Sequence, residues 1–152
     1  MNPPILDAAH FRVTLQTGRD ELRRAYLKNG NATTLLRGHS RLVDKLLAAI
    51  WRHLALPRSM ALIAVGGYGR DQLFPGSDID LLILLPDDPD AARGQHLEQL
   101  VGLLWDIGLE VGHSVRTLSE CIQEAKDITV QTNLLEARFL TGNRGLFNHL
   151  DA

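Results

Sequence analysis

Apolar side chains recur at intervals of three and four residues along several segments of the chain, the spacing that buries one face of a helix. The clearest segment runs from Thr33 to Leu54, and Pro57 prevents this helix from continuing. The first segment has only an imperfect apolar stripe, so we expect a helical extension packed on the outside of the domain. The periodicity predicts helices over residues 5–29, 33–54, 96–107 and 129–140.

Short apolar runs bounded by glycine or proline predict strands that are buried in a sheet. One further segment alternates poorly, but it follows the helix stop Gly108 and precedes a capping-box sequence that opens a helix at Thr117. Because strands alternate with helices, we expect an α+β domain with α/β-like layering, in which helices flank a small mixed sheet. The predicted strands are Met60–Val65, Asp78–Leu85 and Leu109–Arg116, and Gly69–Leu73 is a single helical turn.

The length of 152 residues is enough for one domain with a real core. We divide the chain into an N-terminal helical extension, residues 1–30, and a main domain, residues 31–152. The final apolar residues have no clear helix stop, so we expect the chain to be a fragment of a larger multidomain protein. The formal net charge of −2 argues against general nucleic-acid binding, because phosphate contacts need an excess of Lys and Arg.

The single cysteine, Cys121, has no partner for an internal disulfide, which fits a reducing compartment. The longest apolar run is far shorter than the roughly 20 residues of a membrane helix. No cationic segment followed by an apolar stretch opens the chain, so no secretory signal is visible. We therefore expect a cytoplasmic protein with no membrane partner.

The most informative pattern joins a glycine pair to two alternating aspartates. Gly66 and Gly67 end one predicted strand, and Asp78 and Asp80 open the next. Residues two apart on a strand project to the same face, so both carboxylates point one way. At a separation of roughly 7 Å they repel by about 2 kcal/mol at an effective dielectric constant of about 20, and a divalent cation would remove that penalty. The pattern predicts a metal-dependent phosphoryl-transfer site.

Each half of this pattern has a plainer interpretation. A glycine pair is more often a tight turn than a phosphate cradle, and the segment matches neither a Walker loop nor a complete dinucleotide-binding turn. Two alternating aspartates can also cap or solvate a turn. Here the strand beyond Asp80 is wholly apolar, so we expect Asp80 near the buried edge of the sheet, where an unpaired charge is costly.

The stretch resembles the signature of the polymerase β-like nucleotidyltransferases, in which a glycine turn and a spacer precede two alternating acids on a strand. More narrowly, it is similar to the N-terminal nucleotidyltransferase domain of the bacterial PII uridylyltransferases, and the likeness covers about residues 33–150. The segments that carry it are Gly66–Leu82, Leu103–Asp106, Leu109–Thr117 and Thr132–Arg138.

The resemblance implies a polymerase β-type fold that transfers UMP from UTP to a tyrosine hydroxyl of the PII nitrogen-regulatory protein, with Mg²⁺ or Mn²⁺ as cofactor. By motif position, Gly66 and Gly67 would cradle the phosphates and Ser77 would assist them. Asp78 and Asp80 would bind the metal and act in catalysis. Full-length members also remove UMP and sense glutamine through further domains, and we expect neither property from these residues alone.

Superfamily members usually take a third carboxylate from a neighbouring strand, as metal ligand or base. Glu110 is the only acid in the third predicted strand, and it is either this catalytic residue or a solvated residue at the strand edge. Gly112 can stand where relatives carry the acid, and Asp106 at a helix end is a weaker candidate. Arg70 either contacts phosphate or acceptor, or pairs with Asp71 or another acid.

Four further polar residues lie in the segments that carry the resemblance. We assign nucleotide or acceptor contacts to His113 and Arg116, with a buried, satisfied histidine as the plainer interpretation of His113. For Glu136 and Arg138 we expect structural pairing rather than closure of a nucleotide site. Two alternative functions stay open: a nucleotidyltransferase with another acceptor, and a non-catalytic nucleotide-binding or regulatory module.

Overall fold

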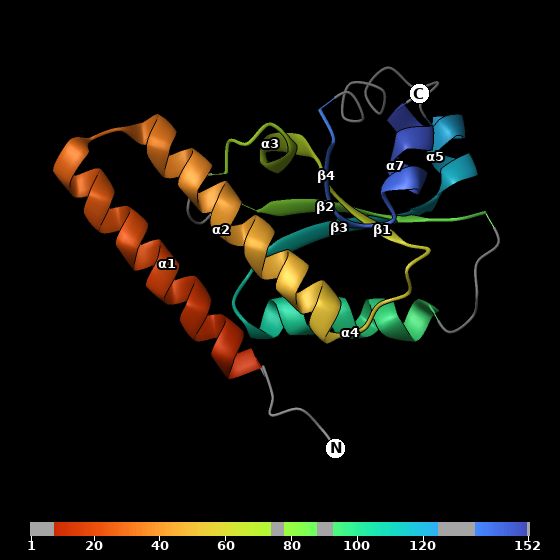
Figure 1. The fold of residues 1–152 in the computed structure, drawn as a ribbon, viewed down its shortest axis with the longest axis horizontal. Helices are drawn as coiled ribbons and strands as arrows, with labels where there is room; N and C mark the ends of the chain where they lie inside the picture. The colour runs from red at the N-terminus through yellow and green to blue at the C-terminus, as the bar shows by residue number, and fades with distance from the viewer. Residues whose placement is uncertain (1–7, 74–77, 88–92, 125–135, 152) are drawn as a thin grey trace.

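The computed structural model describes residues 8–73, 78–87, 93–124 and 136–151. Its strands form one sheet in the order β3-β2-β1-β4, in which β1 runs antiparallel to β2 and β4 while β3 runs parallel to β2 (Figure 1). The mixed sheet and its flanking helices confirm the α+β prediction. The elements are α1 (Ala8–Asn29), α2 (Ala32–His53), β1 (Ala61–Ala64), α3 (Gly66–Gly69), β2 (Ile79–Leu85), α4 (Arg93–Asp106), β3 (Val111–Thr117), α5 (Leu118–Glu124), β4 (Arg138–Gly142) and α7 (Arg144–Asp151).

The sheet separates two apolar clusters. One face packs against α2 and α4, and α1 lies outside α2 and adds Phe11 and Leu15 to this larger cluster (Figure 1). The other face packs against α5 and α7 in a smaller cluster that contains Leu82, Leu84 and Cys121. Residues alternate between the two faces along β2, so this strand contributes apolar side chains to both clusters.

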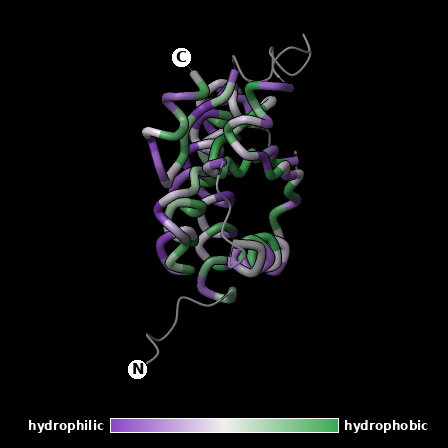
Figure 2. The backbone as a smooth tube through the Cα atoms, turned by 90° about the vertical axis from the view of Figure 1, so that its right-hand side faces the viewer, coloured by the Kyte–Doolittle hydropathy of each residue, from purple (hydrophilic) through white to green (hydrophobic). Residues whose placement is uncertain are grey.

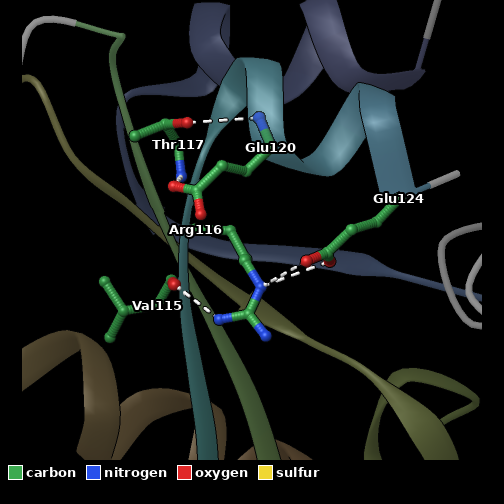
Figure 3. Close-up of polar contacts among 5 residues, drawn as sticks. All are labelled: Val115, Arg116, Thr117, Glu120 and Glu124. Atoms are coloured by element: carbon green, nitrogen blue, oxygen red, sulfur yellow. Dashed lines mark hydrogen bonds and ion pairs between the residues drawn. The ribbon is translucent and has the colours of Figure 1, made fainter.

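Local signals in the sequence account for several of the element ends. The Asn31 side chain accepts a hydrogen bond from the Thr34 N–H at 3.1 Å and so caps α2. The capping box at α5 is confirmed, because Glu120 accepts from the Thr117 N–H while the Thr117 hydroxyl accepts from the Glu120 N–H (Figure 3). The helices expected at 33–54 and 96–107 and all three predicted strands are present, with ends shifted by at most three residues.

Two predictions of secondary structure were wrong. The helix expected over 129–140 is a strand from Arg138 onward, and residues 129–135 lie outside the described part of the chain. This segment pairs with β1, a partner more than 70 positions away that local periodicity cannot reveal. The helical turn expected at 69–73 begins earlier, at Gly66, so the glycine pair is itself the first turn of α3. The division into residues 1–30 and 31–152 stays a prediction.

Hydrophilic and hydrophobic residues follow one another closely along the backbone, as expected for helices that bury only one face (Figure 2). Among the described residues, no helix combines the length and the apolar character needed to cross a membrane.

A buried and an exposed leucine on the two long helices give a test of the core. Leu47 on α2 is 0% exposed, whereas Leu27 on α1 is 75% exposed. We expect Leu47→Ala to lower the free energy of unfolding by about 2–5 kcal/mol, because the cavity adds to the lost burial. The control Leu27→Ala should change it by less than about 0.5 kcal/mol. Urea denaturation followed by circular dichroism measures both, and equal losses would contradict this core assignment.

Candidate active site

The two aspartates lie at the start of the central strand β2. Asp78 directly precedes the strand and Asp80 is its second residue, with Ile79 between them only 1% exposed. Asp80 shares its face of the sheet with Leu82 and Leu84, but it is exposed whereas both leucines are buried. Asp80 is itself exposed, but its strand neighbours Ile79 and Leu81 are buried, so it lies at the border of the buried part of β2.

The surroundings nevertheless disfavour the charge on Asp80. Partial desolvation, followed by the negative charge of Asp78, raises the pKa of the Asp80 carboxyl above its usual value. The pair is a weak point of the isolated fold, since two carboxylates that repel each other contribute nothing to strand stability. Such a pair of hard oxygen donors suits a divalent cation.

Two glycines leave room for the Asp80 carboxylate. Gly66 has a φ of 60°, and a Cβ atom there would lie 2.9 Å from Asp80 Oδ2. Gly112 pairs with Asp80 across β2 and β3, and a Cβ atom there would lie 3.0 Å from Asp80 Oδ1. A side chain at either position would push the carboxylate away, so both residues must be small. Gly112 thus occupies the position directly beside Asp80 on the neighbouring strand.

A hollow of about 460 Å³, here called the site hollow, opens beside Asp80. The first N–H groups of α3 lie at its border, and the N-cap residue Val65 makes no side-chain hydrogen bond to them. Such N–H groups at a helix start are suited to hold phosphate oxygens. The hollow is lined by Val65, Gly66, Asp80, Leu81, Gly112, His113 and Ser114.

The third carboxylate is the least complete part of the site. The Glu110 carbonyl accepts the Ile79 N–H at 2.8 Å, so the exposed Glu110 lies at the end of the sheet where the aspartates are. Asp106 lies at the end of α4, and its carbonyl accepts a hydrogen bond from Arg12. Within the described ranges, no three His, Cys, Asp or Glu residues are grouped closely enough to hold a metal ion by themselves. Ser77 falls outside the described residues.

Arg70 follows the glycine turn and pairs with Glu136 rather than with Asp71. The Arg70 Nη1 atom lies 2.5 Å from Glu136 Oε2, and both side chains are partly exposed. The guanidinium also lies near the turn: a Cβ atom on Gly67 would be 3.8 Å from Arg70 Nη2. The ion pair therefore holds a positive charge beside α3.

A polar network that sequence reasoning missed fixes the back of the same turn. The Tyr68 hydroxyl donates to Asp44 Oδ1 at 2.5 Å, and Arg138 donates to Asp44 Oδ2 at 2.6 Å. Arg138 also donates to the Tyr68 carbonyl at 3.0 Å and lies over the Tyr68 ring. The network joins α2, α3 and β4, so the expectation of a structural role for Arg138 is confirmed.

A buried histidine holds the segment that follows α3. His39 is 0% exposed, and its Nε2 atom accepts a hydrogen bond from Arg19 Nε at 3.0 Å. Its Nδ1 atom therefore carries the proton and donates to the Leu73 carbonyl at 3.1 Å. Desolvation lowers the pKa of His39, so the ring is neutral and links the two long helices to Leu73.

The polar residues of β3 differ from one another in their surroundings. His113 is exposed on the edge strand, so the interpretation as a buried histidine was wrong. Arg116 reaches from β3 to α5, where its Nε atom lies 3.0 Å and 3.2 Å from the two Glu124 carboxylate oxygens (Figure 3). Its Nη1 atom donates to the Val115 carbonyl at 2.8 Å.

Two glycines with positive φ allow a matched test of the space that Gly66 leaves for the Asp80 carboxylate. Gly30 has a φ of 65° and a Cβ atom there would meet nothing within 4 Å, whereas a Cβ atom on Gly66 would meet Asp80. Both alanine variants should lose about 1 kcal/mol of stability through backbone strain. Only Gly66→Ala should weaken Mn²⁺ binding, by about tenfold or more, because it displaces the Asp80 carboxylate, which we expect to bind the metal. Water-proton relaxation reports Mn²⁺ affinity. Equal affinities in the two variants would show that the space at Gly66 is not needed for metal binding.

The Arg138 network gives a second test. Arg138→Met keeps much of the side-chain length but leaves Asp44 and the Tyr68 carbonyl without their donor. We expect the free energy of unfolding to fall by about 1.5–3 kcal/mol, the range for hydrogen bonds to charged groups. Arg41→Met, at an exposed position on the same helix as Asp44, should stay within about 0.5 kcal/mol of wild type. Urea denaturation that fails to separate the variants would show that the network does not stabilise the fold.

Comparison with known proteins points to the same chemistry. The profile of the family described as "Nucleotidyltransferase domain" matches residues 45–135, a range that contains the glycine turn, both aspartates and β3. The "Bifunctional uridylyltransferase/uridylyl-removing enzyme" of Nitrosospira multiformis is 59% identical over 144 residues, which cover 90% of this chain and 16% of the relative. The enzymes of the same name from Aromatoleum aromaticum and Cupriavidus pinatubonensis are 52% and 50% identical, over 91% and 97% of this chain.

The chain spans only 16% to 17% of the length of these curated relatives. The matched range covers more than half of the chain and includes both aspartates and every residue that lines the site hollow. The chain therefore belongs to the nucleotidyltransferase domain family.

Proposed function

We propose that the chain carries the catalytic site for transfer of UMP from UTP to a tyrosine hydroxyl of the PII nitrogen-regulatory protein. The observation that carries this proposal is the exposed Asp78 and Asp80 pair at the start of β2, where Asp80 lines the same hollow as Gly66 of the glycine turn. The similarity to uridylyltransferases supports UTP as the nucleotide. The acceptor follows from the family resemblance of the motifs.

The residues present fit a divalent cation. Mg²⁺ is commonly held by one or two carboxylates together with substrate phosphates, so two aspartates are a sufficient protein contribution. The raised pKa of Asp80 reflects a charge that has no cationic partner among the described side chains. Asp78 and Asp80 would hold Mg²⁺ or Mn²⁺, which would neutralise both carboxylates and the charge that develops on the phosphates.

The other site residues act on the nucleotide. The N–H groups of Gly66 and Gly67 would hold phosphate oxygens, with Ser77 assisting them. Arg70 stands beside this turn and would contribute positive charge to the triphosphate, while Glu136 keeps the guanidinium in place. These contacts orient the α-phosphorus toward the acceptor.

Transfer is a displacement at the α-phosphorus. The tyrosine oxygen bonds to that phosphorus, the bond to the bridging oxygen breaks, and pyrophosphate leaves with the electron pair. Glu110, exposed at the same end of the sheet, would accept the hydroxyl proton.

A non-catalytic nucleotide-binding module is the second candidate. It is favoured by the lack, in the part of the chain that the structure describes, of three grouped acidic or histidine ligands. The retention of both aspartates favours catalysis instead. Incubation of the chain with labelled UTP, Mg²⁺ and PII separates the two, because only the enzyme forms labelled PII and pyrophosphate.

Neutralising Asp80 should abolish metal-dependent UTP binding without unfolding the chain. Calorimetric titration of the four ribonucleotide triphosphates with Mg²⁺ or Mn²⁺ should show a preference for UTP in the wild type and none in Asp80→Asn. The free energy of unfolding of Asp80→Asn should equal or exceed that of the wild type at neutral pH, because a raised carboxyl pKa means that the fold disfavours the charge.

Asp20→Asn, at an exposed position on α1, is the control and should bind like the wild type. Tight, metal-dependent UTP binding by Asp80→Asn would refute the metal site. A different preferred triphosphate in the wild type would keep the site but refute UTP as its substrate.

A further inference from the structure

The outer edge of β3 offers hydrogen-bonding groups to a further strand. β3 is an edge strand, and its inner edge pairs in parallel with β2. The Ile79 N–H donates to the Glu110 carbonyl, so Glu110 and every second residue after it direct their backbone groups toward β2. The N–H and C=O groups of Val111, His113 and Val115 consequently point away from the sheet.

One of these outward groups is already satisfied. The Val115 carbonyl accepts a hydrogen bond from Arg116, whose guanidinium is held in turn by Glu124 (Figure 3). This contact closes the far end of the edge against strand addition. At His113, by contrast, no described residue bonds to the backbone N–H or C=O, and His113 is exposed together with Gly112 and Ser114. The open part of the edge is therefore centred on His113.

This open part leads directly to Asp80. His113, Gly112 and Ser114 all line the site hollow, as does Asp80, which pairs with Gly112 across the two strands. Gly112 lies between the edge and Asp80 on the same face of the sheet, and it has no side chain to block the way. Any Cβ atom at this position would come within 3.0 Å of the Asp80 carboxylate.

We propose that the acceptor polypeptide binds as an extended strand along the His113 edge of β3 and passes its tyrosine side chain over Gly112 to Asp80. This inference rests on the proposed function and adds the route by which the acceptor hydroxyl reaches the site. Strand addition of this kind takes its affinity from main-chain hydrogen bonds.

The same geometry selects the acceptor side chain. A strand added outside β3 lies two strand spacings, about 10 Å, from β2. A tyrosine carries its hydroxyl at the end of a long rigid ring and spans most of this gap. Serine and threonine carry the hydroxyl directly on Cβ and stop above Gly112. The edge route thus favours tyrosine by length, without a pocket that recognises the ring.

Two variants at one position test the main-chain contact. His113→Pro removes the outward N–H and leaves the bonds to β2 intact, since an edge strand tolerates proline where its N–H faces solvent. His113→Ala also removes the imidazole but keeps the N–H. The PII protein, titrated against the chain with Mg²⁺ and a non-hydrolysable UTP analogue, should bind His113→Pro about tenfold more weakly than His113→Ala, as expected for one or two lost strand hydrogen bonds.

The two variants should bind Mg²⁺-UTP with the same affinity and melt at similar temperatures, which separates this effect from misfolding. In the wild type, PII should slow amide hydrogen exchange of residues 111–115, a readout that needs no variant. Equal PII affinities of the two variants, or unchanged exchange in β3 when PII is bound, would overturn the edge route. Wild-type chain that binds Mg²⁺-UTP but not PII would overturn it too, whereas failure to bind UTP at all would refute the proposed function.

Discussion

The alternation of side chains along β2 is the constraint on which both the core and the site depend. Ile79, Leu81 and Ile83 face the cluster under α2 and α4, while Leu82 and Leu84 face the smaller cluster under α5 and α7. Asp80 occupies the same face as the second set, but it is exposed whereas those leucines are buried. A shift of register by one residue would turn Asp80 toward the other face of the sheet, which belongs to the larger apolar cluster, so the alternation along β2 fixes the position of the candidate site as well as the fold.

The site gains its chemistry by giving up local stability. Asp78 and Asp80 repel each other, and the glycines beside Asp80 supply no packing. These costs are confined to one end of the sheet and are offset by rigid surroundings. The Asp44, Tyr68 and Arg138 network holds α3 from behind, and His39 holds Leu73 just after it. The result is a glycine-rich turn whose backbone is held in place by contacts from neighbouring elements.

The sequence predicted the parts that depend on neighbours along the chain. The apolar period of α2, the capping box of α5 and the spacing of Asp78 and Asp80 are all local, and the structure shows each where it was expected. The parts that were missed depend on distant partners. β4 contains only five residues and pairs with β1, and Arg138 meets an aspartate 94 positions earlier. Local periodicity does not reveal contacts between residues so far apart in the sequence, because each partner alone is an ordinary polar or apolar residue.

The residues that identify the family are fewer than the residues that complete the folded sheet, because β4 lies beyond the matched range. The residues matched by the family profile end at 135, yet β4 and α7 begin after that point and complete the sheet. Without them β1 would become an exposed edge strand, and Ala61 and Ile63 would lose the apolar cover that Phe139 and Phe147 provide. The glycine turn would also lose Arg138. On the ribosome, the aspartate strand would therefore leave the exit tunnel well before the segment that stabilises its neighbour, and a nascent chain that stops at the end of the signature would expose an aggregation-prone edge.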